Sequence, residues 1–300
     1  MELTLCGLLL GSRDVVGGME WVKSIAGTPD VAKQVEKGKS QFAGHEILGK
    51  SLGVIGLGAV GGPFANAARK LGMQVYGCDP FISIDAAWHL DSQIHRVNSR
   101  EEVLANCDFI SLHTPLLEDT RKMINAETIA RMKDGVVILN FARDLLVDDE
   151  AMAAALASGK VKRYITDFPN DRTAKMPGCI AIPHLGASTE ESEDNCAKMA
   201  ALELIDYIEN GNIKNSVNYP DASMNAAGTK ICVMHKNVPA VISALTTALG
   251  DAGLNIDNML NKSKKDYAYT LLDVAGDVSD DVVAKLSAVD TVIKVRVIKK

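Results

Sequence analysis

Gly53-Val54-Ile55-Gly56-Leu57-Gly58-Ala59-Val60-Gly61 has the pattern of a strand that runs into a glycine-rich turn and then into a helix. Gly56 allows the tight turn, Gly58 lets backbone N–H groups approach a pyrophosphate, and Gly61 lets the helix pack close to its strand. The phosphates would then lie on the helix N-terminus. A G-x-G-x-x-G run is weak evidence by itself, because glycines also gather in turns that bind no ligand.

The residues on both sides of this turn complete a βαβ unit. Residues 52–55 read as a short apolar strand, residues 59–71 as a helix, and residues 73–78 as a second strand that ends at Asp79. A carboxylate at that position can accept hydrogen bonds from both ribose hydroxyls of an adenosine, and it would repel a 2′-phosphate. The sequence therefore predicts a dinucleotide site that favours NAD over NADP.

Composition and charge exclude several classes of protein. The chain has 300 residues, 47% of them hydrophobic, which suits two domains or so with buried cores. A net charge of -6 without a dense Lys/Arg block argues against a nucleic-acid surface. The six cysteines are scattered, with no C-x-x-C pair and no zinc-like histidine spacing, so reduced and mostly buried thiols and no metal site are expected.

The first residues could pass for the apolar core of a signal peptide. Residues 3–11 are apolar, but they follow Glu2 rather than a basic region, and no A-x-A cleavage site follows. The run is also too short to span a bilayer. We expect a cytoplasmic protein with no membrane partner.

The N-terminal 40 residues or so have helical patterns. Apolar residues recur at helical spacing from Leu5 to Val22, which predicts a single helix that ends near Ile25. Its apolar stripe must be covered, and a core helix and a dimer-interface helix are both open. Thr28 and Pro29 predict a second, short helix that ends near Gly38, with Thr28 as its N-cap.

Beyond Asp79 the pattern alternates between strands and helices. Strands are expected at residues 109–113, 136–140, 161–166 and 179–182, and helices at residues 99–105, 126–132 and 148–158. This alternation predicts a parallel, doubly wound Rossmann sheet of the α/β class. A capping box at residues 188–191 opens a long amphipathic helix that ends at Gly211.

The last part of the chain changes character. After a segment rich in Asn and small residues, residues 229–298 read as strand, helix, strand, strand, helix, strand. That order, β-α-β-β-α-β, is typical of a ferredoxin-like unit. We expect a separate small domain.

Polar side chains follow three of the predicted strands, in residues 140–143, 166–171 and 182–184. Each group alone has an ordinary explanation, such as a surface cation or a turn. Because ligands bind at the carboxyl ends of strands in such sheets, the three groups are expected to meet at one edge.

Several motifs together resemble the D-2-hydroxyacid dehydrogenase family: residues 46–53 before the glycine turn, residues 113–115, residues 140–143 and residues 183–189. The C-terminal unit resembles an ACT domain, an amino-acid-sensing module. The resemblance covers nearly the whole chain. With the ACT-like unit it implies NAD-dependent oxidation of 3-phospho-D-glycerate to 3-phosphohydroxypyruvate, the first step of L-serine biosynthesis. Two alternatives remain open: another family member, such as a hydroxypyruvate or glyoxylate reductase, and a non-catalytic NAD- or serine-binding protein.

The resemblance also implies roles for single residues. Arg143 would pair with the carboxylate of a small 2-hydroxy acid, and His184 would act as the acid/base on its C2 hydroxyl group. The family usually supplies a Glu as the partner of this histidine; the present chain is one residue shorter there and offers Asp171. Asp144 stands where the family usually has Gly, and its charge would compete for Arg143 if it pointed inward.

The cofactor contacts that the resemblance implies, together with those of the glycine turn, are Gly56, Gly58, Ala59, Val60, Gly61, Asp79, His113, Thr114, Pro115, Ala142, Asp167, His184 and Gly186. Asp167 would contact the nicotinamide carboxamide.

In the ACT-like unit, His235, Asn237 and Asn255 match residues that bind an L-serine effector in the family. The other reading is that they only cap and turn the chain. Ala240 stands where many ACT domains have Gly, and its methyl group would crowd an effector.

The expected domains follow from these assignments. Residues 1–45 would be interdomain or dimer helices left from a substrate domain, 46–187 the NAD-binding Rossmann domain, 188–212 a long helix returning to the substrate domain, 213–227 a linker, and 228–300 the ACT-like regulatory domain. Family members begin with a substrate-domain segment that contacts the substrate phosphate, so a truncated or fragmentary form is expected. A homo-oligomer, dimer or tetramer, is also expected.

Overall fold

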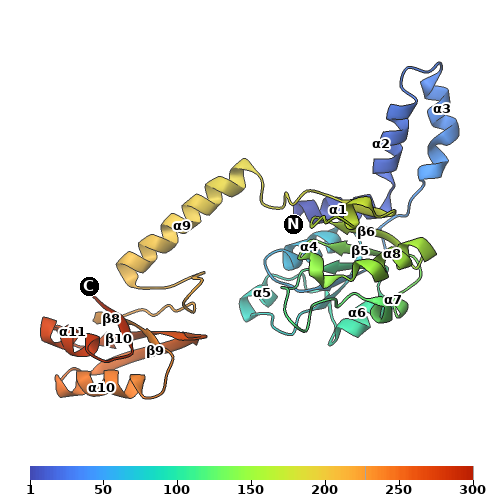
Figure 1. Cartoon of the computed structure of the whole chain (residues 1–300). Helices are drawn as coiled ribbons and strands as arrows, with labels where there is room; N and C mark the ends of the chain where they lie inside the picture. The colour runs from blue at the N-terminus through green and yellow to red at the C-terminus, as the bar shows by residue number, and fades with distance from the viewer. Residues whose placement is uncertain (227, 300) are drawn as a thin grey trace. The chain divides into compact units, whose positions relative to one another are not determined.

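The computed structural model describes residues 1–226 and 228–299 and divides into two compact units, Met1–Ser188 and Thr189–Lys300. Each unit has its own hydrophobic core and is described by itself (Figure 1). Ala227 and Lys300, which end the expected linker and the expected C-terminal domain, lie outside the described residues.

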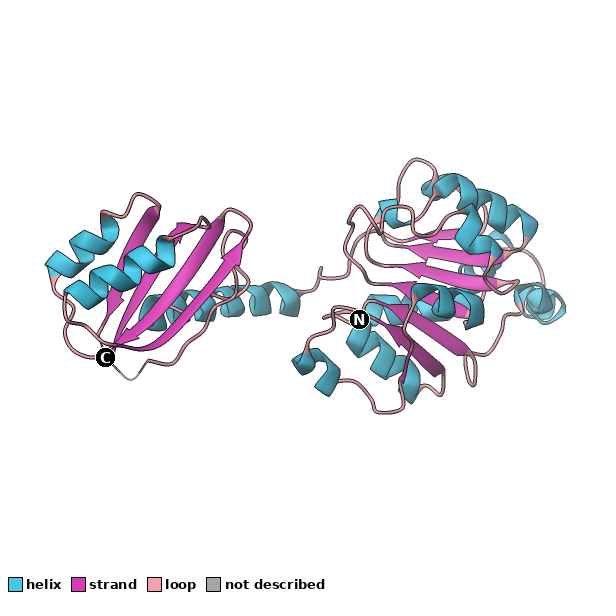
Figure 2. Ribbon diagram, turned by 90° about the horizontal axis from the view of Figure 1, so that it is seen from below, coloured by secondary structure: helices cyan, strands magenta, loops and turns pink. Residues whose placement is uncertain are grey.

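A parallel sheet of seven strands forms the first unit (Figures 1 and 2). Its strands are β1 (Ser51–Ile55), β2 (Gln74–Cys78), β3 (His95–Arg96), β4 (Phe109–Leu112), β5 (Val136–Asn140), β6 (Val161–Thr166) and β7 (Cys179–Ala181). They lie in the order β3-β2-β1-β4-β5-β6-β7, and all their pairings are parallel. The predicted doubly wound Rossmann sheet is confirmed, and its strand order reverses between β1 and β4, where such sheets bind ligands.

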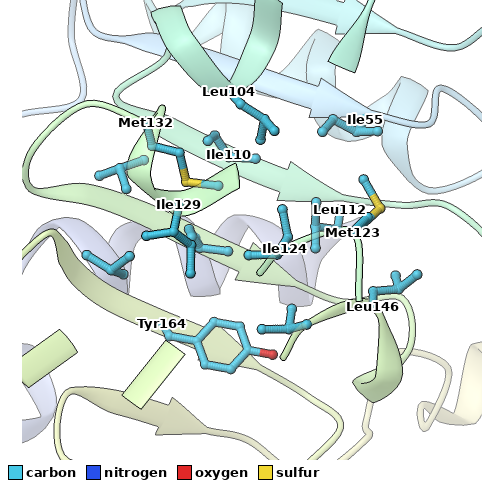
Figure 3. Packing of buried hydrophobic residues seen from close by; sticks show 14 of the residues in the cluster. Ile55, Leu104, Ile110, Leu112, Met123, Ile124, Ile129, Met132, Leu146 and Tyr164 are labelled. Atoms are coloured by element: carbon cyan, nitrogen blue, oxygen red, sulfur yellow. The ribbon is translucent and has the colours of Figure 1, made fainter. Parts of the chain in front are cut away.

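Helices cover both faces of this sheet. On one face α6 (Arg100–Asn106), α7 (Ala126–Ala130) and α8 (Asp149–Ser158) pack on the strands, and Figure 3 shows part of that core around Leu104, Ile129 and Tyr164. On the other face, α1 (Glu2–Ser12) and α4 (Gly61–Lys70) pack through Leu8 and Phe64. The central strands β1, β4 and β5 are buried along their whole length, which explains their nearly continuous apolar runs.

The remaining elements of this unit are short. They are α2 (Val15–Ser24), α3 (Val31–Gly38), η1 (Lys39–Phe42), α5 (Ile84–Trp88), η2 (Asp144–Leu146) and η3 (Thr173–Lys175).

The single N-terminal helix predicted to end near Ile25 is wrong, because the chain forms α1 and α2 with a break at Arg13. Arg13 is extended, and the Asp14 side chain accepts a hydrogen bond from the Gly17 N–H, so it caps a new helix. The Thr28 cap is also wrong: its hydroxyl donates to the Ile25 carbonyl, and α3 begins after Asp30.

The second unit consists of a long helix and an antiparallel sheet. Its elements are α9 (Glu190–Asn210), β8 (Thr229–Lys236), α10 (Val241–Asp251), β9 (Ile256–Lys264), β10 (Tyr267–Val274), α11 (Asp280–Ser287) and β11 (Val292–Ile298). The strand order β11-β8-β10-β9 with two helices is the topology of a ferredoxin-like unit. The N-cap of α9 is Thr189, one residue after the Ser188 that the capping box had predicted.

The two faces of this antiparallel sheet are covered differently. α10 and α11 pack on one face through Leu245 and Leu286 (Figure 2). The other face holds Tyr269 and Leu271, against which Tyr207 at the end of α9 packs. None of the helices in the described parts of the chain is long and apolar enough to cross a membrane.

Candidate functional site

The glycine turn connects β1 to α4 with little room for side chains. Gly56 has a φ of 93°, and a Cβ there would lie 2.6 Å from the His113 carbonyl oxygen. A Cβ on Gly61 would lie 2.0 Å from the Gly56 carbonyl oxygen. At Gly58, by contrast, a Cβ would meet no atom within 4 Å. Gly56 and Gly61 are thus required for packing, whereas Gly58 leaves open the space that a phosphate needs.

Asp79, which follows β2, is tied to the glycine turn. Its carboxylate accepts a hydrogen bond from the Leu57 N–H at 2.8 Å and another from the Phe81 N–H at 2.9 Å. A carboxylate has about four acceptor positions, so both oxygens can still receive hydroxyl groups. The geometry suits recognition of a ribose diol beside the phosphate site.

His113 follows β4 and lies beside the glycine turn. Its Nε2 is 2.8 Å from the Ser111 hydroxyl oxygen, whereas its Nδ1 is buried and has no partner. Burial lowers the pKa of this imidazole to about 4, because it disfavours the charged ring. Thr114 and Pro115 continue this strand end, where the Pro115 carbonyl accepts from the Thr120 hydroxyl.

The segment after β5 presents Arg143. The buried Asn140 side chain donates to the Arg143 carbonyl at 2.8 Å and to the Tyr164 hydroxyl at 3.1 Å, and it accepts from the Ala142 N–H at 3.3 Å. These bonds fix the backbone while the exposed Arg143 guanidinium group remains near the surface. Asp144 accepts from the Leu145 N–H at 2.6 Å, and no ion pair joins it to Arg143 in the described parts of the chain.

Asp167 and Phe168 follow β6. Asp167 is buried, and its Oδ1 has no hydrogen-bond partner. Burial raises the pKa of this carboxyl group, and the positive charges of His184 and Arg143 partly oppose the rise. The Phe168 ring contacts the His184 ring, with centroids 4.5 Å apart, and the Arg143 guanidinium carbon lies 5.6 Å from the same ring centroid.

His184 and Gly186 lie in the loop after β7. His184 is exposed apart from its contact with Phe168. A Cβ on Gly186 would lie 4.0 Å from the Asp167 Oδ2, so this loop passes close to the buried carboxyl group. The structure therefore brings together Arg143, Asp167 and His184, which come from three different strand ends.

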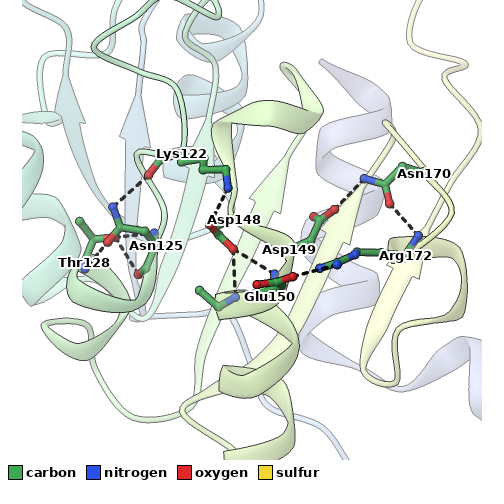
Figure 4. Close-up of polar contacts among 9 residues, drawn as sticks. Lys122, Asn125, Thr128, Asp148, Asp149, Glu150, Asn170 and Arg172 are labelled. Carbon is green, nitrogen blue, oxygen red and sulfur yellow. Dashed lines mark hydrogen bonds and ion pairs between the residues drawn. The ribbon is translucent and has the colours of Figure 1, made fainter.

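Asp171 lies on a loop whose neighbouring side chains contact α8. Asn170 donates to the Asp149 carboxylate at 2.9 Å and accepts from the Arg172 N–H, and Arg172 forms an ion pair with Glu150 at 2.8 Å (Figure 4). These contacts tie the loop to the first turn of α8. Asp171 is exposed, and within the described residues no hydrogen bond or ion pair joins it to His184.

Tyr164 of this site was not recognised in the sequence, and Asn140 and Phe168 were named only as parts of the strand-end segments, without a role of their own. In the sequence, Phe168 has the features of an ordinary packing residue in a turn. The Asn140–Tyr164 hydrogen bond joins residues 24 positions apart, and burial raises the pKa of the Tyr164 hydroxyl group. The only available signal was a polar side chain in each of two apolar strands.

The residues at this edge fit a dinucleotide. In the parts of the chain that the structure describes, the buried polar side-chain atoms without a partner are His113 Nδ1, Asp167 Oδ1 and Thr291 Oγ1. The first two belong to strand ends of the Rossmann sheet, and such orphaned groups are rare unless a ligand or water satisfies them. Over the same residues, no cluster of His, Cys, Asp or Glu has the arrangement of a metal site.

The three residues matched to an effector site lie in the second unit. His235 is buried, and both its ring nitrogens are occupied: Nδ1 is 2.8 Å from the Lys236 carbonyl oxygen and Nε2 is 2.8 Å from the Thr270 hydroxyl. Asn237 donates to the Lys265 carbonyl, and Asn255 donates to the Asp257 carboxylate. Each side chain thus has a partner within its own domain.

The chain is similar to curated proteins along most of its length. It is 32% identical over 313 residues to a D-3-phosphoglycerate dehydrogenase of Haemophilus influenzae, covering 99% of this chain and 72% of that protein. It is 29% identical over 291 residues to the D-3-phosphoglycerate dehydrogenase of Escherichia coli K12, covering 91% of this chain and 70% of the relative.

Solved structures and a family model agree with these relatives. A D-lactate dehydrogenase of Aquifex aeolicus, solved with NAD and lactic acid, is 25% identical with a TM-score of 0.56, and the match covers 69% of this chain and 65% of that one. Residues 19–186 match the model described as the D-isomer specific 2-hydroxyacid dehydrogenase, NAD binding domain. The chain therefore belongs to the D-isomer-specific 2-hydroxyacid dehydrogenases, a family of NAD-dependent oxidoreductases, and NAD is the cofactor of its Rossmann domain.

Proposed function

We propose that this chain oxidises 3-phospho-D-glycerate at C2 to 3-phosphohydroxypyruvate with NAD, the first step of L-serine biosynthesis. The observation that carries the chemistry is the cluster of Arg143 and His184 on one aromatic ring, with the buried Asp167 beside them. The names of the relatives at about 30% identity support the choice of substrate.

Each residue of the cluster has a chemical task in this proposal. Arg143 binds the substrate carboxylate through its planar fork of N–H donors and thereby orients C2. A ring nitrogen of His184 takes the proton of the C2 hydroxyl group during oxidation and returns it in the reverse reaction. When bound, NAD accepts the hydride that leaves C2.

The cofactor would be held along the carboxyl edge of the sheet. The backbone of Gly56, Gly58, Ala59, Val60 and Gly61 would bind its phosphates, and Asp79 would bind the adenosine ribose. The unpartnered Oδ1 of Asp167 would accept an N–H of the nicotinamide carboxamide. We place the remaining expected contacts, His113, Thr114, Pro115, Ala142 and Gly186, at the same edge.

A second candidate is the reduction of a small 2-oxo acid without a phosphate group. Two solved relatives favour it: the pyruvate reductase of Chlamydomonas reinhardtii, 26% identical with a TM-score of 0.55, and a D-lactate dehydrogenase of Treponema pallidum, 26% identical with a TM-score of 0.57. The matches cover 65% and 64% of those two chains. The chain thus spans somewhat under two thirds of these neighbours.

The two candidates differ in substrate, so steady-state kinetics separates them. The purified chain would be assayed for NADH formation with 3-phosphoglycerate and D-lactate, and for NADH oxidation with hydroxypyruvate, glyoxylate and pyruvate. The proposal expects the highest kcat/KM with 3-phosphoglycerate, and a fall of at least about a hundredfold in His184→Gln. Arg143→Gln should raise the KM for the hydroxy acid, because it removes the charge that binds the substrate carboxylate. Arg172→Gln is its matched control, since Arg172 also lies on a strand-end loop but pairs with Glu150.

NAD binding is measured apart from turnover, by the fluorescence of bound NADH. Binding of NADH with no turnover of any hydroxy acid would support the non-catalytic NAD-binding protein instead. Preference for pyruvate or glyoxylate would support the second candidate.

We also propose that L-serine binds the ferredoxin-like domain as an effector. The support is the position of His235 near the end of β8 and of Asn237 in the loop between β8 and α10, together with the topology of the domain. Because His235 is buried whereas Asn237 and Asn255 are exposed, the ligand would meet Asn237 and Asn255 first. Calorimetry of the full chain with L-serine tests this, and an absence of binding heat at millimolar serine would contradict it.

We propose that the chain forms a homo-oligomer through α2 and α3. A hollow of about 530 Å³ lies there, lined mainly by apolar side chains such as Trp21, Val35 and Phe42, and Met19 is 56% exposed beside it. Light scattering of the wild type and Met19→Glu checks this, since a charge in a buried interface should shift the chain toward monomer.

A further inference from the structure

Phe168 makes two contacts that no other described residue combines. Its ring lies 4.5 Å from the His184 ring, tilted by 46°, and the Arg143 guanidinium carbon lies 5.6 Å from its centroid. Arg143 and His184 come from the loops after β5 and β7, and both are exposed. Apart from the hydrogen bond that the Arg143 Nη1 donates to the Ala142 carbonyl at 2.6 Å, the Phe168 ring is the surface that limits the rotamers of these two side chains.

The backbone that carries the Phe168 ring is held by its neighbours. Its backbone N–H donates to the buried Thr166 hydroxyl at 3.1 Å, and the buried Asp167 precedes it. Pro169 follows and restricts the backbone of Phe168 to extended conformations. The ring is therefore attached to the sheet rather than to a free loop.

An aromatic ring suits this position for an electrostatic reason. Arg143 is always charged, and the imidazole of an acid/base histidine must alternate between its neutral and charged forms. A carboxylate partner binds mainly the charged form, whereas a ring face attracts cations and also stacks with a neutral ring. Asp171, the expected carboxylate partner, is exposed and lies on a loop tied to α8.

We propose that Phe168 is a positioning residue that holds Arg143 and His184 in a fixed relative arrangement. This inference rests on the proposed function for its catalytic consequence, but the arrangement itself exists in the chain without ligands.

The arrangement is tested by NMR on the full chain without NAD. Phe168→Leu removes the ring, Phe168→Tyr keeps it, and Phe42→Leu is the matched control, since the Phe42 ring contacts Trp21 instead. We expect Phe168→Leu to abolish the ring-current shift of the His184 ring protons and to lower the order parameters of the His184 ring and the Arg143 Nε–H. Phe168→Tyr and Phe42→Leu should retain the wild-type values.

Kinetics supplies the functional half of the test. With whichever hydroxy acid the wild type turns over, Phe168→Leu should lower kcat/KM about tenfold or more through both kcat and KM, and Phe168→Tyr should restore most of it. Unchanged order parameters in Phe168→Leu, or a failure of Phe168→Tyr to rescue, would overturn the inference. If the order parameters differ between the wild type and Phe168→Leu as expected, but the wild type oxidises no hydroxy acid, only the proposed function is contradicted.

Discussion

His113 shows how a single buried nitrogen makes stability depend on pH. Its folded pKa of about 4 lies below the usual value of 6.5, so the unfolded chain binds more protons between these values. The contribution to stability is therefore complete above about pH 6.5 and is lost as the pH falls through about 4. We expect the free energy of unfolding to fall by about 2–3 kcal/mol from pH 7.5 to pH 4.5 on this account.

The measurement is urea unfolding followed by tryptophan fluorescence, because Trp21 and Trp88 both lie in the first unit. His113→Gln, which has no titrating ring, should lose this part of the pH dependence. The same slope in the variant and the wild type would show that other groups produce it.

Ala240 carries a second prediction, because it is a non-glycine residue with a φ of 69° directly before α10. An L-residue with a Cβ is strained in this left-handed region, and glycine is not. We expect Ala240→Gly to stabilise the second unit by about 0.5–1 kcal/mol, measured by hydrogen exchange of the β8 amides. Ala248→Gly, inside α10, should instead destabilise it by about 1 kcal/mol.

Residues differ in how well the sequence predicts them. The roles of Gly56 and Gly61 follow from spacing, because close approach of two backbones leaves a fixed pattern of missing side chains. The contact of Phe168 with His184 leaves no such pattern, since the two residues meet only after β6 and β7 pair. The loop of Asp171 shows the same limit, because its contacts with Asp149 and Glu150 of α8 join residues about 20 positions apart and leave no pattern in the sequence.

At the scale of elements, two glycines of the β1–α4 turn differ in the role that we expect: Gly61 is needed for packing, and Gly58 for cofactor binding. Gly61→Ala would place a Cβ 2.0 Å from the Gly56 carbonyl oxygen, so we expect it to destabilise the first unit by about 1–3 kcal/mol. Gly58→Ala meets no atom within 4 Å and should change the free energy of unfolding by less than about 0.5 kcal/mol.

Gly58→Ala, which should hardly change stability, is the variant that we expect to weaken cofactor binding. The methyl group of Gly58→Ala would stand in the space for the phosphates, so the Kd for NADH should rise by at least about tenfold. Tryptophan-monitored urea unfolding and NADH fluorescence give the two quantities. A Gly58→Ala variant with normal affinity would place the phosphates elsewhere.

The type of an element was predictable where its apolar spacing persists over many residues. The ends of elements were harder to predict. The break between α1 and α2 was missed because the apolar spacing continues across it, while the capping hydrogen bond of Asp14 depends on one side-chain rotamer. β5 was located at its observed ends because it is buried throughout and apolar up to Asn140. β6 was also located at its observed ends, although it contains Lys162 and Arg163 and is buried without interruption only from Tyr164 onward.

At the scale of the molecule, α9 is joined to the ferredoxin-like sheet through its C-terminal carbonyl groups. Arg296 donates to the Tyr207 and Ile208 carbonyls at 3.0 and 2.9 Å, and Lys230 donates to the Asn210 carbonyl. The Tyr269 hydroxyl donates to the Gly211 carbonyl at 2.7 Å. The last turn of a helix has no internal partners for these groups, so side chains of the sheet complete it. The sequence could not predict this, since the partners lie 20 to 89 residues away.

Tyr269→Phe tests whether α9 and the sheet form one cooperative unit that is independent of the Rossmann unit. The change leaves the buried Gly211 carbonyl without its donor, so we expect the second unit to lose about 1–2 kcal/mol of stability, read from hydrogen exchange of the β8 and α9 amides together. The urea midpoint reported by Trp21 and Trp88 should not move, because the first unit has its own core. Tyr267→Phe is the matched control on the same strand, as its side chain is 41% exposed and its hydroxyl has no hydrogen bond within the described residues. A shift of the tryptophan midpoint in Tyr269→Phe would mean that the two units unfold as one.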